Sequence, residues 1–341
     1  MKILIVGFGS IGRRHKELAR KLFPDANICV FNRGNLYGKI HANITIVKSL
    51  DEAKKFSPDI VVVSNATSEH VSITLQLIST GAHFLIEKPI SHSTQDVTRL
   101  IEEFRKANKV LMVGYNLRQL ESLQKFREYV SQNKIGYPIS VRCEVGKYLP
   151  SWRPSIDYRR SVSARNDLGG GVLLELSHEI DYLRWIFGEI KWVRASLFKQ
   201  SVLEIDVEDT AHLVLGFKSE FMGRQLIANL SMDFIRRDTT RQCIVIGENG
   251  SLKWDGISGE VSIYLPNENK WKILFVDKKG IDETYLLEWI DFIRAIEDKK
   301  EPSVTGVDGL RVLETIEAAR ISSQTGIQKN VINSKLKGER K

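Results

Sequence analysis

The chain has 341 residues, of which 42% are hydrophobic and 27% charged, as in ordinary globular proteins. At roughly 150 residues per domain, this length predicts two domains, and no apolar run approaches the roughly 18 residues that cross a bilayer. The net charge of +8 comes without a dense Lys/Arg helix or interleaved basic and aromatic residues. This disfavours nucleic-acid binding and suits a phosphorylated or nucleotide-bearing small molecule.

The cysteine pattern argues against a secreted protein. Cys29, Cys143 and Cys243 are odd in number, and their spacing is not that of a metal site. We therefore expect a reducing, cytoplasmic setting, without a disulfide framework or a bound metal.

Residues 1–119 alternate strand-like and helix-like segments. Short apolar runs rich in β-branched residues occupy positions 3–8, 27–31, 60–65, 83–88 and 110–115. Such runs are typical of parallel strands that are buried on both faces. Helical patterns lie between them, and the one over 69–81 ends at a glycine, as helices often do. This alternation predicts a doubly wound α/β sheet, a Rossmann domain.

Residues 120–341 show a different pattern of expected helices and strands. A helix is expected at about 120–133 and another over 172–187, and two more, at about 283–298 and 307–325, close the chain. Longer strand candidates occupy 192–200, 209–217, 224–234, 241–247, 250–255 and 260–265. Several alternate polar and apolar residues, which predicts an α+β domain with a large, mainly antiparallel open sheet.

A glycine-rich turn, "GFGSIG", joins the first expected strand to the first helix. Gly7 would allow the tight turn, Gly9 would let a pyrophosphate approach the backbone, and Gly12 would permit close packing. Backbone N–H groups at the helix start, around Ser10 and Ile11, would bind the phosphates. The pattern predicts dinucleotide binding, and the alternative is a structural turn that binds nothing.

The residue that faces the adenosine ribose should lie about 20 positions after the last glycine. Asn32 occupies that place, where NAD-specific sites usually carry Asp or Glu, and Arg33 follows it. Asn32 does not repel a 2′-phosphate and Arg33 could pair with one. We therefore expect NADP, or the use of both NADP and NAD, with a solvated turn as the alternative for Arg33.

Other strand ends also carry polar residues, and ligands of open parallel sheets lie at the carboxyl ends of the strands. "SNATSEH" offers Asn65, Thr67 and His70 to line the nicotinamide side. "EKP" places Lys88 immediately after a buried strand, and we expect Glu87 and Lys88 to contact the cofactor. The ammonium of Lys88 could also orient a hydroxyl or stabilise a developing alkoxide. A surface lysine at a strand end is the alternative.

Two further segments are expected to touch the substrate. "GYNLR" ends the fifth strand and carries Asn116 and Arg118. The irregular segment 147–171 could close over a substrate, with an indole on a sugar face and arginines on a carboxylate or phosphate. Its candidates are Trp152, Arg153, Tyr158, Arg159 and Arg165. A solvated surface loop is the alternative.

"GGGVLLELSHEID", residues 169–181, opens the helix expected over 172–187. An apolar stripe would face the core, and Glu175, His178 and Asp181 would fall on the opposite side. That side is either solvated or the wall of a partly apolar cleft, where neighbouring carboxylates tune a histidine near neutral pH. The glycines would let another group approach the helix start closely.

In this order and at these distances, "GFGSIG", "EKP" and "GGGVLLELSHEIDYLRWIFG" resemble the Gfo/Idh/MocA family of NAD(P)-dependent sugar oxidoreductases. The resemblance covers essentially the whole chain. It implies a Rossmann domain, an α+β domain whose open sheet forms homodimers or homotetramers, and sugar, cyclitol or nucleotide-sugar substrates. It also assigns Lys88 as the substrate-orienting lysine and His178 as the general acid/base. The family has an acidic residue four positions before this histidine, but this chain has Leu174 there and an acidic residue, Glu175, one position later. We therefore rank Glu175 below Lys88 and His178 as a candidate for binding substrate.

These features predict reversible hydride transfer between a sugar CH–OH carbon and nicotinamide, with His178 exchanging the hydroxyl proton and Lys88 holding the hydroxyl. The 147–171 segment resembles a subgroup often encountered in bacterial surface-polysaccharide or nonulosonic-acid pathways. One alternative is a non-catalytic NAD(P)-binding regulator of the same fold, which would not need Lys88 and His178. Another is an enzyme that oxidises and re-reduces its substrate in one closed cycle. A tightly retained cofactor would favour this second alternative.

Overall fold

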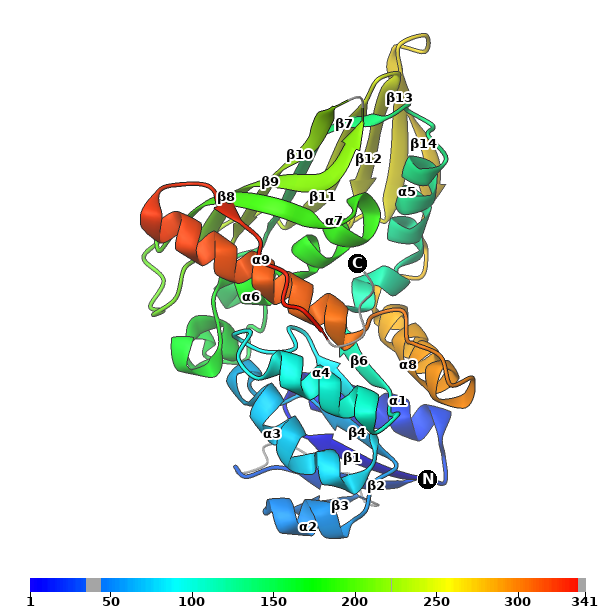
Figure 1. Ribbon diagram of the computed structural model, residues 1–341, viewed down its shortest axis with the longest axis vertical. Helices are drawn as coiled ribbons and strands as arrows, with labels where there is room; N and C mark the ends of the chain where they lie inside the picture. The colour runs from blue at the N-terminus through cyan, green and yellow to red at the C-terminus, as the bar shows by residue number, and fades with distance from the viewer. Residues whose placement is uncertain (35–43, 222, 337–341) are drawn as a thin grey trace. The chain divides into compact units, whose positions relative to one another are not determined.

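The computed structural model describes residues 1–34, 44–221 and 223–336, and these divide into two compact units (Figure 1). Unit 1 consists of Met1–Tyr115, Tyr285–Leu313 and Ser334–Lys341, and unit 2 of Asn116–Thr284 and Glu314–Asn333. The first boundary lies close to the one expected after residue 119. The chain then returns to unit 1 at Tyr285, a return that the change in sequence rhythm does not reveal.

Within the described part of unit 1, six parallel strands form one sheet in the order β3-β2-β1-β4-β5-β6. This is the doubly wound order of dinucleotide-binding domains. The strands are β1 (Lys2–Val6), β2 (Asn27–Phe31), β3 (Thr45–Val47), β4 (Ile60–Val63), β5 (His83–Glu87) and β6 (Leu111–Gly114). The five expected strands are confirmed, while β3 is too short to stand out in the sequence.

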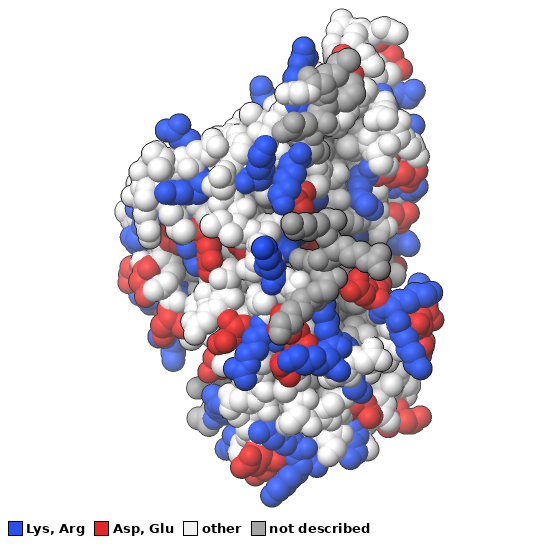
Figure 2. Space-filling view, in the orientation of Figure 1, with Lys and Arg blue, Asp and Glu red and all other residues white. Residues whose placement is uncertain are grey.

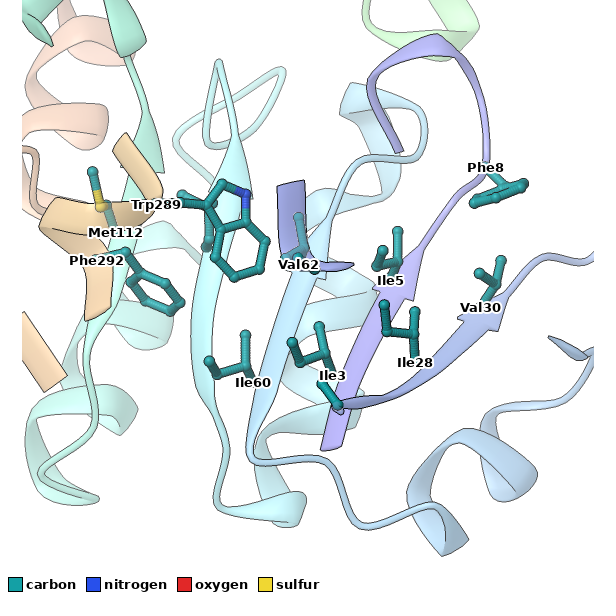
Figure 3. Close-up of a cluster of buried hydrophobic side chains, with 13 residues drawn as sticks. Ile3, Ile5, Phe8, Ile28, Val30, Ile60, Val62, Met112, Trp289 and Phe292 are labelled. Atoms are coloured by element: carbon teal, nitrogen blue, oxygen red, sulfur yellow. The ribbon is translucent and has the colours of Figure 1, made fainter. Parts of the chain in front are cut away.

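The helices that lie wholly in unit 1 are α1 (Ser10–Leu22), α2 (Leu50–Lys55), α3 (His70–Leu77) and α4 (Val97–Lys106). Of α8 (Ile281–Glu297) and α9 (Gly306–Thr325), unit 1 contains the parts from Tyr285 onward and up to Leu313. The predicted C-cap at Gly81 is confirmed, since this glycine has φ 70° after the short 3₁₀ helix Ile78–Thr80. Trp289 and Phe292 of α8 pack into the same core as Ile3 and Ile60 of the sheet (Figure 3). Burial of these aromatic rings explains why the chain returns to unit 1.

In the described part of unit 2, nine strands form a sheet in the order β14-β13-β12-β11-β7-β10-β9-β8-β15. Neighbouring strands of this sheet pair antiparallel, except β10 and β7, which are parallel. The sheet is thus mainly antiparallel, as the sequence predicts. The strands are β7 (Pro138–Gly146), β8 (Ile190–Phe198), β9 (Thr210–Phe221), β10 (Arg224–Asp233), β11 (Thr240–Gly247), β12 (Gly250–Asp255), β13 (Glu260–Leu265), β14 (Lys270–Val276) and β15 (Lys329–Asn330). The helices are α5 (Glu121–Ser131), α6 (Val172–Glu175) and α7 (His178–Phe187). The edge strand β14, which is largely exposed, was not among the expected strands.

The surface agrees with the charge distribution read from the sequence. Figure 2 shows Lys and Arg side chains interspersed with Asp and Glu on the drawn face, rather than gathered into one basic field. Within the described ranges, no helix combines the length and the apolar character that a membrane crossing requires.

Candidate active site

The glycine turn after β1 has the geometry of a pyrophosphate cradle. Gly7 has φ 84°, and a Cβ there would lie 2.7 Å from the backbone of Asn65. A Cβ on Gly12 would lie 2.2 Å from the carbonyl oxygen of Gly7, so both glycines are required by the fold itself. A Cβ on Gly9 would meet no described atom within 4 Å outside its chain neighbours. The space over Gly9 is therefore open to a ligand, as the sequence predicts.

The start of α1 supplies the donors for that space. Gly9 is the N-cap, no described side chain caps the first turn, and that turn contains no acidic residue. Ser10 and Ile11 begin this helix of 13 residues. Free N–H groups at a helix N-terminus bind phosphate well, so these residues fit a dinucleotide.

The predicted ribose-binding residues lie beside an acidic side chain. The Nδ2 group of Asn32 donates to the carbonyl oxygen of Gly34 at 2.7 Å. The Arg33 guanidinium lies 3.5 Å from Oε1 of Glu69, and both side chains are about half exposed. Glu69 brings a negative charge close to the group expected to bind a 2′-phosphate, a contact that the sequence did not reveal because 36 residues separate the two.

The loop after β4 packs against the glycine turn. The Ser64 hydroxyl donates to the carbonyl oxygen of Val6 at 3.0 Å, and the Asn65 amide donates to Glu69 at 2.8 Å. The Oδ1 atom of Asn65 is buried and has no hydrogen-bond partner among the described residues. Thr67, at the start of the short 3₁₀ helix Thr67–Glu69, is buried as well. Asn65 is thus the predicted residue of this loop that has a polar atom left for a ligand.

His70 lies in a different environment from the expected ligand lining. It is 1% exposed, with Nδ1 2.9 Å from the carbonyl oxygen of Pro89 and Nε2 3.2 Å from that of Asn65. Burial lowers the pKa of its imidazole, although these hydrogen bonds oppose the effect. The ring therefore joins the loop after β4 to the turn after β5, which is a scaffolding contact.

Lys88 is half-buried and follows β5 directly, with a cis peptide bond to Pro89. Its backbone N–H donates to Oε2 of Glu87 at 3.2 Å. The other carboxylate oxygen of Glu87 lies 2.8 Å from Nε2 of His15. The carboxylate of Glu87 thus contacts His15 of α1 and the backbone of Lys88. The sequence suggested instead that Glu87 contacts the cofactor directly.

Two residues predicted to bind substrate are buried in hydrogen bonds of unit 2. Asn116 donates to the hydroxyl oxygen of Thr284 at 2.7 Å, and these residues stand at two of the four places where the chain passes between the units. Arg118 donates to both carboxylate oxygens of Asp181, at 2.9 and 2.6 Å. The sequence indicated neither partner, because 168 and 63 positions separate the two pairs.

The single helix expected over 172–187 is wrong. The structure has α6 up to Glu175 and α7 from His178, with Leu176 at φ −100° and ψ 25° between them. His178, which is half-buried, therefore begins a helix of its own. Glu175 and His178 belong to different helices, so the expectation that they share one face of a continuous helix does not apply. Of the polar residues expected on this side, Asp181 is 1% exposed, whereas Glu175 and His178 are half-buried.

The three glycines before α6 permit close approaches, as predicted. A Cβ on Gly170 would lie 2.2 Å from the carbonyl oxygen of Val162. Gly171 has φ 106°, and its Cβ would lie 2.4 Å from the Glu208 carboxylate. Burial raises the pKa of the Glu208 carboxyl, which accepts a hydrogen bond from the backbone of Leu173. The approaching groups therefore belong to the protein and fix the lead-in to His178.

The irregular segment 147–171 folds into four short 3₁₀ helices among the described residues: Leu149–Ser151, Tyr158–Arg160, Val162–Ala164 and Asn166–Leu168. Trp152 donates from its indole to the carbonyl oxygen of Lys147 at 2.9 Å. Trp152, Arg153 and Tyr158 line a hollow of about 20 Å³. That volume suits about one water molecule, so a sugar would need the segment to move.

Arginines of this segment contact acidic residues close by. Arg159 donates to Asp157 at 2.9 Å and to Glu204 at 3.2 Å. Arg165 donates to Asp167 at 2.9 and 2.6 Å. An anionic substrate would have to compete with these carboxylates for the two guanidinium groups.

Both halves of the chain match models of one oxidoreductase family. Residues 1–115 match the model described as "Oxidoreductase family, NAD-binding Rossmann fold". Residues 127–330 match the one described as "Oxidoreductase family, C-terminal alpha/beta domain". The two models, GFO_IDH_MocA and GFO_IDH_MocA_C, follow one another in the expected order.

Among curated relatives, the myo-inositol 2-dehydrogenase of Thermotoga maritima is 28% identical over 329 residues, 92% of this chain and 93% of the relative. The 1,5-anhydro-D-fructose reductase of Ensifer adhaerens is 28% identical over 79% of this chain and 78% of its own. Both are named as enzymes that reduce or oxidise sugars or cyclitols.

Solved structures share the fold over nearly the whole chain. The WlbA dehydrogenase from Bordetella pertussis, in complex with NADH and UDP-GlcNAcA, has a TM-score of 0.80 at 19% identity, covering 98% of this chain and 99% of that one. The UDP-N-acetylglucosamine 3-dehydrogenase GnnA from Acidithiobacillus ferrooxidans has a TM-score of 0.72 at 20% identity, covering 95% and 98%. With the Rossmann turn in place and both domain models matched, the chain belongs to the Gfo/Idh/MocA family of NAD(P)-dependent oxidoreductases.

Proposed function

We propose that the protein transfers a hydride between a CH–OH carbon of a sugar, cyclitol or nucleotide sugar and nicotinamide, with a role in bacterial surface-polysaccharide or nonulosonic-acid biosynthesis. The observation that carries this proposal is the cradle at Gly9, open to a ligand and backed by the uncapped start of α1. When NADP or NAD is bound there, its nicotinamide accepts or supplies the hydride. The names of the relatives support a polyhydroxylated substrate.

Two side chains would handle the substrate hydroxyl. Lys88 would hold it and reduce the cost of its developing negative charge. His178 would take the hydroxyl proton during oxidation and return one during reduction. The rigid lead-in to α7, fixed by Gly170 and Gly171, supports an accurate placement of this imidazole.

Turnover of a substrate panel tests the proposal. Reduced nicotinamide is followed with NAD and NADP separately against myo-inositol, sugar phosphates, UDP-N-acetylglucosamine and its uronic acid. We expect wild type to turn over one of these classes, and His178→Ala to lose roughly 10²–10⁴-fold in rate. His212→Ala, which removes an exposed histidine from β9, is the matched control. Near-full turnover by His178→Ala would overturn the assigned role.

The alternatives give different results in the same experiment. A protein that binds cofactor reversibly but turns nothing over would be a regulator of the same fold. A protein purified with tightly retained nicotinamide, which converts substrate without net change in the cofactor, would follow a closed oxidation and re-reduction cycle.

We also propose that the open sheet of unit 2 binds a second copy of the chain, forming a homodimer or homotetramer. Alternation on β10 buries Ala228 and Leu230 and leaves Ile227 exposed, and β14 exposes Trp271 and Ile273. Exposed apolar side chains on one sheet are typical of an interface. Sedimentation of wild type and of the double variant Ile227→Lys/Ile273→Lys tests this, with a smaller species expected for the variant.

We further propose a cytoplasmic location, which the three free, buried cysteines support.

A further inference from the structure

Beside Lys88, unit 1 contains a buried polar cluster of which the sequence motifs include only Glu87, and to which the proposed chemistry assigns no role. Its members are His15 of α1, Glu87 of β5, and Glu288 and Trp289 of α8. His15, Glu288 and Trp289 are completely buried, and Glu87 is 8% exposed. A buried polar group destabilises the fold unless it forms hydrogen bonds, so each donor in this cluster should face an acceptor. This requirement determines which atoms carry the protons.

The indole of Trp289 determines which nitrogen of His15 carries a proton. Its Nε1–H donates to Nδ1 of His15 at 2.9 Å. An indole N–H can only donate, so Nδ1 must carry the lone pair. The ring proton therefore lies on Nε2, which is 2.8 Å from Oε1 of Glu87. His15 is thus a neutral donor to Glu87, and the negative charge of this carboxylate is not neutralised by an imidazolium.

The same arrangement argues against a metal ion. One potential ligand atom each from His15, Glu87 and Glu288 lies within 4.8 Å of the others. To ligate with Nε2, His15 would have to move its proton to Nδ1, where the Trp289 N–H already points. The geometry therefore favours protons over a cation as the charges that this cluster binds.

Glu288 carries the second proton of the cluster. Neither of its carboxyl oxygens has a hydrogen-bond partner among the described residues. Burial raises the pKa of the Glu288 carboxyl well above its usual range, and the carboxylates of Glu87 and Asp291 raise it further. Burial also opposes ionisation of Glu87, whereas the hydrogen bond that Glu87 accepts from His15 favours its ionised form. One carboxylate and one neutral acid therefore share the site.

We propose that His15 and Trp289 are positioning residues for Lys88: the indole fixes the imidazole, the imidazole fixes one oxygen of Glu87, and the other oxygen fixes the backbone N–H of Lys88. This chain of contacts joins α8 and the phosphate-binding helix α1 to the lysine. The catalytic consequence rests on the proposed function of Lys88, whereas the proton positions do not. The titratable and charged groups facing the cluster are Arg14, His15, Glu87, Lys88, Tyr285, Glu288 and Asp291.

The first test needs no substrate. In protein labelled with ¹⁵N-histidine, the His15 signals are assigned by their loss in His15→Gln, and long-range ¹⁵N spectra then report the ring protons. We expect one ring proton, on Nε2, at neutral pH. An imidazolium, or a neutral ring with its proton on Nδ1, at neutral pH would overturn the proposal even if no sugar is turned over.

The second test breaks the first link with Trp289→Phe. Trp254→Phe is the matched control, because Trp254 is also completely buried and donates from its indole to Ser122 at 3.1 Å, in unit 2. We expect Trp289→Phe to leave Nδ1 of His15 without its indole donor and to speed amide hydrogen exchange at Lys88. Equal exchange at Lys88 in both variants would contradict the proposed chain of contacts.

The third readout links the cluster to turnover. In Trp289→Phe, kcat should fall about tenfold, the lower end of what positioning residues contribute, while KM for the sugar changes little. The dependence of its turnover on pH should differ from that of wild type. Trp254→Phe should keep the wild-type profile. A Trp289→Phe profile identical to wild type would exclude a positioning role, whereas absent wild-type turnover would instead count against the proposed function.

Discussion

Arg118 and Asp181 form a buried ion pair with two hydrogen bonds. Their side chains are 5% and 2% exposed, and the N–O distances are 2.9 and 2.6 Å. Removal of one partner leaves a charge in a place that water cannot reach. The pair thus fixes the first turn of α7, which begins at His178, to the segment that follows β6.

The first prediction concerns this pair. Asp181→Asn should lower the free energy of unfolding by about 3–5 kcal/mol in urea titrations, because the Arg118 charge stays buried and uncompensated. The matched control is Asp167→Asn, which breaks the pair between Arg165 and Asp167. Both of those side chains are about half exposed, so we expect little change. Equal losses in the two variants would show that burial does not determine the effect.

The double variant Arg118→Met/Asp181→Leu separates the buried charge from the packing. Replacing both partners removes the uncompensated charge, so it should recover much of the stability lost in Asp181→Asn. If Arg118 also binds substrate, as the sequence suggests, the stable double variant would show a raised KM for the sugar.

A second prediction addresses the choice of cofactor. Arg33→Ala should weaken NADP binding about 10- to 100-fold, the usual contribution of a charged hydrogen bond, and leave NAD binding unchanged. Glu69→Gln should have the opposite effect on NADP, since it removes the negative charge 3.5 Å from Arg33. Fluorescence titration with both cofactors measures each constant. Equal effects on NADP and NAD would place Arg33 away from the 2′-phosphate.

The elements that could be predicted from the sequence depend on local patterns. The strands of unit 1 are short apolar runs, and Gly7 and Gly12 are required by a turn only six residues long. The break between α6 and α7 has no such signal, because neither glycine nor proline stands at Leu176 or Ser177. Periodicity alone therefore extended one helix through it.

Contacts between distant residues remained hidden for a different reason. Trp289 and His15 are 274 positions apart, and Arg241 and Glu179 are 62 apart. A polar residue in a sequence does not name its partner until the topology is known. For His15 a weak signal existed, since it shares the buried face of α1 with Gly12 and Ala19, where a polar side chain needs a partner.

The third prediction tests the glycines that precede α6. Gly170→Ala and Gly171→Ala should destabilise the protein more than Gly188→Ala, measured as the change in unfolding midpoint. Gly188 has φ 92° but open space around its Cβ position, so alanine there meets only the backbone strain of roughly 1–2 kcal/mol. Alanine at Gly170, where φ is not positive, would clash with the carbonyl oxygen of Val162. Alanine at Gly171 would combine a φ of 106° with a clash against the Glu208 carboxylate. Equal effects at all three sites would mean that the segment moves to make room.

The fourth prediction concerns pH and Glu288. Because its carboxyl pKa is raised by burial, Glu288 is protonated in the folded protein and ionised in the unfolded chain above about pH 4.3. Folding then takes up a proton, so wild type loses stability as the pH rises. Glu288→Gln cannot ionise, and its advantage should grow by up to about 1.4 kcal/mol per pH unit until the folded carboxyl itself ionises.

Urea unfolding of wild type and Glu288→Gln at several pH values between about 4 and 8 measures this difference. The two proteins should have nearly equal stability at the acidic end and diverge towards neutral pH, with the glutamine variant the more stable. Glu297→Gln, an exposed change on the same helix α8, controls for the loss of one acidic group. If Glu288 were instead ionised in the folded state and held by a cation, the glutamine variant would be the less stable protein at neutral pH. The sign of the difference therefore distinguishes a buried neutral acid from a charged ligand.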